Sequence, residues 1–235
     1  MKKVILLVSP CVMIVLFLML ASCGDQLKTD NPPSGAITDI DGNVYHAVTI
    51  GSQIWMVENL KVTKYRNSDP IQNATTSNLW LNLVNGAYAW YDNDSKNKSL
   101  YGALYNWYAI KDIRNIAPVG WHVATDSDWT ILTTYIGGES LAGGKLKETG
   151  LTHWSSPNTG ATNQYGFTAL PGGIISGGIS DGIGAEGVWW SYIITTPTDY
   201  SHNWHREMWL DEVTVDKSGY IFQNGLGFSV RCVKD

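Results

Sequence analysis

Cysteine is scarce in this sequence. Only three cysteines occur among 235 residues, at positions 11, 23 and 232. The first two lie within or directly after the N-terminal apolar run, so the remainder of the chain has Cys232 alone and no internal disulfide is expected. Its neighbours Val230 and Val233 indicate a strand, and a buried thiol is favoured there over one available for intermolecular pairing.

Charge is also sparse, and basic charge especially so. Charged residues make up 16% of the chain, against about 25% in an average soluble protein. Residues 1–22 contain two of the 16 basic residues and no acidic ones. The rest of the chain therefore has 14 basic and 21 acidic residues, which gives it a formal charge of −7. No basic stripe follows Lys3, so nucleic acid is excluded as a partner.

Sequence signatures of catalysis are missing too. The chain has no phosphate-binding loop and no zinc-protease helix. We therefore expect no enzyme activity, no cofactor and no bound metal. What the chain does have is an excess of Trp, with 11 residues, and of Gly, with 24.

The N-terminus has the order of a secretory signal peptide. Lys2 and Lys3 precede an apolar run from Val4 to Leu20, and the following Ala21-Ser22-Cys23 resembles the lipobox of bacterial lipoproteins. We predict cleavage after residue 22 and lipidation of Cys23, which would tether the protein to an envelope membrane. The alternative is an uncleaved transmembrane anchor, since about seventeen apolar residues can just span a bilayer.

Behind this segment the sequence divides into a tether and one domain. Residues 23–36 contain almost no apolar side chains and indicate a flexible tether, whereas residues 37–235 are mixed throughout and correspond to one domain. The domain opens with turn chemistry at residues 39–43. A hairpin is predicted from strands 44–50 and 53–57.

Three helices and several later strands are predicted within the domain. Helical spacing suggests a helix over residues 101–110, a capping box starts a second at Thr125, and a third surrounds residues 141–148. Strands are expected at 188–194, 206–210, 220–223 and 227–233, separated by Gly-rich turns. The predicted class is α+β, with small antiparallel sheets and long Gly-rich loops.

Ordered motifs across the domain resemble a known family. They lie at residues 39–45, 54–60, 101–107, 117–123, 143–147, 166–173, 187–191 and 227–233. In this order they are similar to the Fibrobacter succinogenes major paralogous domain of Bacteroidota and Fibrobacterota envelope proteins. The resemblance implies a fold related to C-type-lectin-like domains and supplies no established activity, since a fold does not fix a function. Some members carry a cysteine at the position of Ala117, which could pair with the one at Cys232.

The aromatic residues divide into core and candidate ligand-binding groups. Those inside the family-like motifs are expected in the core: Trp55, Trp107, Trp121, Trp129, Trp189 and Trp190. Those in more loop-like stretches are candidates for stacking on a sugar or anchoring a protein: Trp80, Trp154, Tyr200, Trp204 and Trp209.

Other polar clusters are weaker candidates. His202 and His205 have a spacing that can bind metal on a helix, but the segment favours a polar surface stretch. His122 is expected to be partly buried. Residues 92–97 are rich in oxygen ligands, yet Lys96 in the fifth position favours a solvated turn over a calcium loop.

Three functions remain open at this point. The leading one is a non-catalytic binding or adhesion module for a glycan or protein, displayed on the cell envelope. The second is an enzyme acting on envelope polysaccharide, which requires two facing carboxylates. The carboxylates to inspect for that activity are Glu58, Asp126, Asp128 and Glu186. The third is a structural or assembly lipoprotein, recognisable by a contiguous apolar patch.

Overall fold

Short strands dominate the domain, as the dense turn signals predict. The structure is a computed structural model that describes residues 36–191, 203–220 and 225–235. The predicted signal peptide, the lipidation site Cys23 and nearly all of the tether lie outside the described residues. Everything below concerns the unit formed by residues 31–235.

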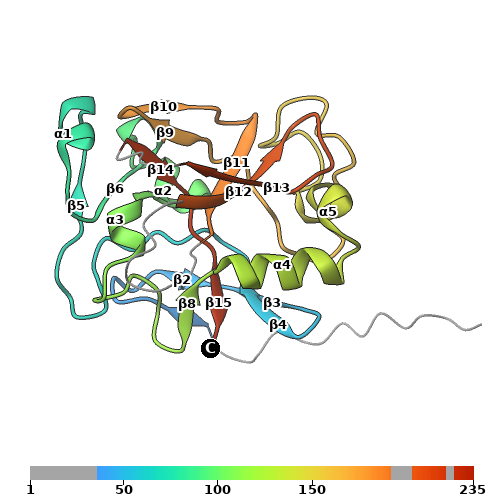
Figure 1. The fold of residues 1–235 in the computed structure, drawn as a ribbon, viewed down its shortest axis with the longest axis horizontal. Helices are drawn as coiled ribbons and strands as arrows, with labels where there is room; N and C mark the ends of the chain where they lie inside the picture. The colour runs from blue at the N-terminus through green and yellow to red at the C-terminus, as the bar shows by residue number, and fades with distance from the viewer. Residues whose placement is uncertain (1–35, 192–202, 221–224) are drawn as a thin grey trace, which may run out of the picture. The chain divides into compact units, whose positions relative to one another are not determined.

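The strands form four sheets, and every pairing is antiparallel except that of β5 with β6 (Figure 1). The small sheet pairs β1 (Ile37–Thr38) with β2 (Val44–Tyr45). The four-stranded sheet has the order β3 (Ala47–Ile50), β4 (Gln53–Met56), β15 (Cys232–Lys234), β8 (Trp121–Val123). The six-stranded sheet runs β10 (Ile179–Asp181), β9 (Ile174–Ser176), β14 (Leu226–Phe228), β7 (Leu104–Asn106), β6 (Ala87–Ala89), β5 (Gln72–Asn73). The three-stranded sheet contains β11 (Glu186–Trp190), β12 (Asn203–Trp209) and β13 (Asp216–Tyr220).

Short helices connect these strands. They are α1 (Ser77–Asn82), α2 (Asn97–Tyr101), α3 (Trp107–Ile110), α4 (Asp126–Tyr135) and α5 (Glu139–Leu146), with a 3-10 turn η1 at Tyr91–Asn93. No helix in the described part of the chain has the length and apolar character needed to cross a bilayer. The α+β class and the hairpin of β3 and β4 are confirmed.

The capping box predicted from the sequence starts α4. The Thr125 side chain accepts a hydrogen bond from the Asp128 backbone N–H at 3.1 Å, and the Asp128 carboxylate accepts one from the Thr125 N–H at 2.8 Å. Asp126 and Asp128 also place negative charge at the positive end of the helix dipole. Local sequence therefore fixes where this helix begins.

The single helix predicted over residues 101–110 is wrong. Gly102, with φ of +76°, ends α2, and the chain then enters the six-stranded sheet as β7 before α3 begins. Leu104 and Tyr105 are both buried, because this strand is covered on its two faces. Asn106 accepts a hydrogen bond from the Ala109 N–H at 3.0 Å and caps α3. Apolar residues at helical spacing here reflect two-sided burial, which periodicity alone cannot separate from a helix.

The last predicted strand, residues 227–233, is divided between two sheets. β14 joins the six-stranded sheet and β15 pairs with β4 and β8. Between them, Arg231 is buried, donating to the carbonyls of Met56 (2.7 Å), Phe167 (3.0 Å) and Thr168 (2.9 Å). Of the predicted strands 188–194 and 220–223, residues 192–194 and 221–223 lie outside the described residues.

Aromatic side chains fill the core, as expected for small sheets. Trp55, Trp129, Phe167 and Trp189 form a cluster with ring centroids 5.1 to 6.0 Å apart. Edge-to-face contacts of this kind contribute about 0.5–1.5 kcal/mol each beyond area burial. Cys232 is fully buried, as predicted, and burial raises the pKa of its thiol well above the ordinary value.

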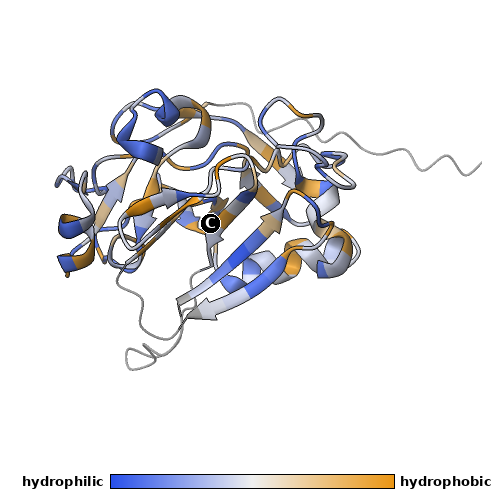
Figure 2. Cartoon of the chain, turned by 90° about the horizontal axis from the view of Figure 1, so that it is seen from above, coloured by the Kyte–Doolittle hydropathy of each residue, from blue (hydrophilic) through white to orange (hydrophobic). Residues whose placement is uncertain are grey.

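Apolar side chains are also present on the surface, but they come from separate elements. Figure 2 shows hydrophobic and hydrophilic stretches interleaved along the strands and helices. The most exposed large apolar residues are Val84, Ile113, Val119, Leu151 and Ile179. Ile113 and Val119 lie in the connection between α3 and β8, and the other three lie in separate connections or strands. Such scattered residues are normal on a protein surface.

Candidate functional site

One face of the three-stranded sheet carries an unusual set of polar and aromatic side chains. Because side chains alternate along a strand, His205, Glu207 and Trp209 of β12 share this face. The register places Trp209 opposite Glu186 of β11 and Glu207 opposite Val188. The sheet therefore brings two carboxylates, an imidazole and an indole together.

A pocket of about 400 Å³ opens over this face. Its lining combines strands β9, β10, β11, β12 and β14: Ile174, Ser176, Asp181, Glu186, Val188, His205, Glu207, Trp209, Leu226 and Phe228. Backbone hydrogen bonds hold its walls together, since the Ser229 N–H donates to the Val188 carbonyl at 3.0 Å and the Gly173 N–H to the Glu186 carbonyl at 3.0 Å. We call this the β11–β12 pocket, after the two strands labelled in Figure 1.

Glu207 is well supplied with hydrogen bonds. Its Oε1 lies 2.6 Å from Nε2 of the buried His205, and its Oε2 accepts from the Trp209 indole N–H at 3.3 Å. The hydrogen bond from His205 is the main reason that the pKa of Glu207 is lowered, with further contributions from Trp209 and Ser218. Glu207 is therefore ionised at neutral pH, and its bond to Trp209 orients the indole.

Glu186 has the opposite surroundings. Its side chain is 6% exposed, and none of the described residues donates a hydrogen bond or forms an ion pair with its carboxylate. Burial, followed by the negative charges of Glu207 and Asp181, raises its pKa from 4.5 to about 7. Gly182 lies directly against this carboxylate, where a Cβ atom would collide with Oε1. Two neighbouring carboxylates thus have their pKa values moved in opposite directions.

Of the four candidate aromatic residues that the structure describes, Trp209 alone lines this pocket. Trp209 is half-buried, while Trp204 lies on the opposite face of β12 with Lys217 Nζ 4.4 Å from its ring centroid. Tyr200 lies outside the described residues. The assignment of Trp80 and Trp154 to exposed loops is wrong, since each is 1% exposed.

Both buried tryptophans have structural reasons for their positions. The Trp154 indole N–H donates to the Ala169 carbonyl at 2.9 Å, and Lys147 Nζ lies 5.2 Å from the Trp154 ring centroid. Trp80 packs against Gly227 of β14, where a Cβ atom would lie 2.6 Å from the indole. Loop-like sequence around an aromatic residue therefore did not indicate exposure here.

The four carboxylates named from the sequence do not converge. Glu58 pairs with His46 at 2.6 Å, Asp126 with Arg206 at 2.6 Å, and Asp128 with His122 at 3.0 Å. Glu186 instead lies near Glu207 and Asp181, whose negative charges help raise its pKa, and neither residue was predicted as a site residue from the sequence. Alternation of His205, Glu207 and Trp209 along one strand was the signal that could have identified them.

The histidine predictions have mixed outcomes. His122 is partly buried, as expected, and its hydrogen bond to Asp128 is the main cause of its raised pKa. The surface position expected for His205 is wrong, because it is 1% exposed, and His202 lies outside the described residues. Among the described residues, no group of three or more His, Cys, Asp or Glu side chains has an arrangement suited to a metal ion. The segment 92–96 is exposed, as predicted for a solvated turn.

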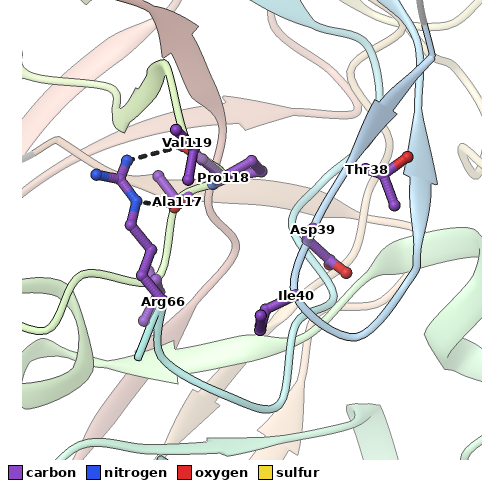
Figure 3. Close-up of a pocket in the computed structure, with 8 residues that line it drawn as sticks. Thr38, Asp39, Ile40, Arg66, Ala117, Pro118 and Val119 are labelled. Atoms are coloured by element: carbon purple, nitrogen blue, oxygen red, sulfur yellow. Dashed lines mark hydrogen bonds between the residues drawn. The ribbon is translucent and has the colours of Figure 1, made fainter. Parts of the chain in front are cut away.

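A second pocket, of about 200 Å³, is structural in character (Figure 3). Arg66 lines it, but its guanidinium donates to the carbonyls of Ala117 (2.6 Å) and Pro118 (2.7 Å) and also to that of Trp121. The carboxylate of Asp39 accepts four hydrogen bonds from its own turn and Tyr45. Both charged groups already form hydrogen bonds that hold loops together, so this pocket has few polar groups left to bind a ligand.

Comparison with known proteins identifies the family. Residues 48–234 match the family model described as the Fibrobacter succinogenes major domain. The chain belongs to this family. No curated protein and no solved structure matches it, so the relationship to C-type-lectin-like domains stays a prediction.

The motifs of the Fibrobacter succinogenes major domain meet at Asn59. Its Oδ1 accepts hydrogen bonds from Trp189 Nε1 and Arg231 Nε, each at 2.8 Å. Its Nδ2 donates to the Tyr101 carbonyl at 2.8 Å and to Ser229 Oγ at 3.2 Å. Four separate sequence motifs are thereby joined through one buried amide. This network supports β11, and with it one wall of the β11–β12 pocket.

Proposed function

We propose that this protein is a cell-envelope lipoprotein displaying a non-catalytic binding module, and that the β11–β12 pocket binds one unit of an envelope glycan. The observation that carries the proposal is Glu186, a buried carboxylate that faces the pocket without a hydrogen-bond donor among the described residues. A buried polar group in this state is costly unless water or a ligand in the pocket supplies the donor. Sugars carry many such donors.

The walls of the pocket suit a sugar in two ways. Trp209 offers an aromatic face, held in place by its hydrogen bond to Glu207, and Phe228 and Val188 add apolar surface. Carboxylates and a serine at the rim can accept hydrogen bonds from hydroxyl groups. A volume of about 400 Å³ falls within the range of small-molecule sites, roughly 300–1,000 Å³. A C-type-lectin-like relationship is consistent with this proposal.

Lipidation of Cys23 would place the module at the membrane surface. The support is the order of basic residues, apolar run and lipobox-like Leu20-Ala21-Ser22-Cys23 in the sequence. Metabolic labelling with a fatty-acid analogue should label the wild-type protein and leave Cys23→Ala unlabelled. Equal labelling of both proteins would rule out this anchor.

Binding to a panel of glycans tests the ligand proposal directly. The full chain, purified from membranes in detergent, should retain on a glycan array a limited set of sugars. The variant Ser176→Lys places a long charged side chain at the exposed rim of the pocket and should lose that binding, whereas Val84→Lys, at an exposed position away from the pocket, should retain it. Retention only of envelope proteins by the wild type, with no glycan bound, would contradict the glycan proposal.

A second candidate function is glycoside hydrolysis by Glu186 and Glu207. The opposite pKa shifts of the two carboxylates favour it, because such a split is how one carboxyl becomes an acid and its neighbour stays ionised. Against it, the oxygens of Glu207 already accept hydrogen bonds from His205 and Trp209. Incubation with the glycans retained on the array decides between the two: release of new reducing ends that Glu186→Gln abolishes would establish the enzyme.

A further inference from the structure

The acidic side chains of the β11–β12 pocket are not equivalent. Asp181 accepts a hydrogen bond from the Gly182 N–H at 2.8 Å, and Glu207 accepts from His205 and Trp209. Glu186 alone among the three has no donor from any described residue, although it is the most buried of them. Glu186 is therefore the carboxylate of this pocket that a ligand could supply with a hydrogen-bond donor or a positive charge.

The excess of negative charge in the pocket indicates which kind of ligand group could pair with Glu186. Three carboxylates line it against a single histidine, which is already bonded to Glu207, and no described lysine or arginine belongs to the lining. Neighbouring negative charges in a partly closed site repel one another unless one of the carboxylates takes up a proton or a cation lies between them. A neutral hydroxyl would satisfy one oxygen of Glu186 but would leave the excess charge in place. A ligand with a positive charge satisfies both requirements.

The apolar walls of the pocket indicate what kind of molecule should carry the positive charge. Trp209, Phe228 and Leu226 surround the acidic groups, so the charged group must be attached to a body with an apolar face. A pyranose ring has such a face and can bear an amine. Resting on the glycan-binding function proposed above, we propose that the pocket recognises an amino sugar through its free primary ammonium group, which pairs with the Glu186 carboxylate. N-acetylation of that amine removes the charge and adds bulk, so acetylated sugars are excluded.

Binding of this kind is linked to a proton. Around neutral pH the Glu186 carboxyl is partly protonated, because its pKa is raised to about 7. An ammonium group stabilises the ionised form, so ligand binding releases protons to the buffer. The other titratable groups that line the pocket are Asp181 on β10 and Glu207 with His205 on β12. A ligand bound through hydroxyl groups alone would not release protons from Glu186.

Calorimetry on the full chain in detergent tests the proposal. The probes are glucosamine tetrasaccharide, N-acetylglucosamine tetrasaccharide and Nα-acetyl-lysine amide, each titrated in two buffers of different ionisation enthalpy at pH 6, where the amines already carry their proton and the Glu186 carboxyl is still largely protonated. Glucosamine tetrasaccharide should bind at least 10-fold more tightly than the other two, with proton release. Glu186→Gln should weaken its binding at least 10-fold and abolish the proton release. Asp94→Asn, which removes one acidic charge at an exposed turn, should change neither.

The remaining outcomes separate this inference from the proposed function. Equal or tighter binding of the acetylated tetrasaccharide, unaffected by Glu186→Gln, would overturn the ammonium proposal and leave a glycan site. Tight binding of the lysine derivative alone would assign the ammonium to a peptide and overturn both. Absence of binding to either tetrasaccharide, by a wild-type sample that shows a cooperative unfolding transition, would also contradict both.

Discussion

Glu186 and Trp209 are direct partners across β11 and β12, and both side chains line the same pocket. Glu186 supplies a buried carboxylate that receives no hydrogen bond from the described residues, and Trp209 supplies an indole oriented by Glu207. Directly opposite residues on antiparallel strands have Cβ atoms about 4.5–5.5 Å apart. A single sugar ring can therefore contact both side chains at once.

Truncation of the indole tests the aromatic half of this site. Trp209→Ala should weaken glycan binding about 10-fold, because stacking surface is lost while the fold remains. Trp204→Ala is the matched control, since Trp204 is half-buried like Trp209 but lies on the other face of β12. Affinity by calorimetry should change less than 2-fold in the control. Equal losses in both variants would indicate a general effect on β12.

Removal of the charge on Glu186 should stabilise the protein. The folded-state pKa of this acid is raised, so its contribution is favourable below pH 4.5 and is lost as the pH rises through about 7. Glu186→Gln should therefore match the wild type near pH 4.5 and exceed its free energy of unfolding by about 1–3 kcal/mol at pH 8. Urea denaturation at both pH values measures this, with Asp94→Asn as control. A loss of stability at pH 8 would show that Glu186 has a partner.

Such a gain would have a functional meaning. A residue that destabilises the folded state without a structural benefit is typical of binding and catalytic sites. The combination expected for Glu186→Gln, higher stability with weaker ligand binding, distinguishes a site residue from a structural one.

Trp154 should behave in the opposite way. Its side chain is 1% exposed and donates to the Ala169 carbonyl. Trp154→Ala should lower the free energy of unfolding by about 3–5 kcal/mol, while the protein that remains folded binds its glycan with unchanged affinity. Weaker glycan binding with unaltered stability would show that Trp154 contributes to ligand binding.

The amide of Asn59 should be equally important for stability. Asn59→Ala removes the acceptor shared by Trp189 and Arg231 and leaves both buried donors unpaired. We expect a loss of about 3 kcal/mol in the free energy of unfolding. Asn73→Ala, at an exposed position in β5, should change it by less than about 0.5 kcal/mol. A small effect at Asn59 would mean that water replaces its side chain.

Local signals in the sequence predicted local structure well. The capping box at Thr125 and the hairpin turn at Gly51 were both found where expected, because the residues that determine them are adjacent in the chain. The position of Cys232 in the core followed from its apolar neighbours. Family motifs were also recognisable from the sequence, yet their convergence on Asn59 depends on tertiary contacts.

The site itself was only half predictable. Trp209 and Glu186 were named as candidates, but for different functions, because nothing in the sequence shows that they are cross-strand partners. Glu207 was not predicted, because its role depends on its contacts with His205 and Trp209 and on its proximity to Glu186 in the folded protein. Trp80 and Trp154 were misplaced because the small sheets bury aromatic side chains of the segments that connect them, helix α1 for Trp80 and a loop for Trp154.

Indole resonances offer the most direct test of the glycan pocket. In a ¹⁵N–¹H spectrum of the protein in detergent, titration with glucosamine tetrasaccharide should shift the Trp209 indole resonance along a saturable curve. The indoles of Trp80 and Trp154, buried outside the pocket lining, should not move. A Trp209 resonance that stays in place while Trp204 shifts, or a spectrum unchanged at millimolar sugar, would contradict the assignment of this pocket.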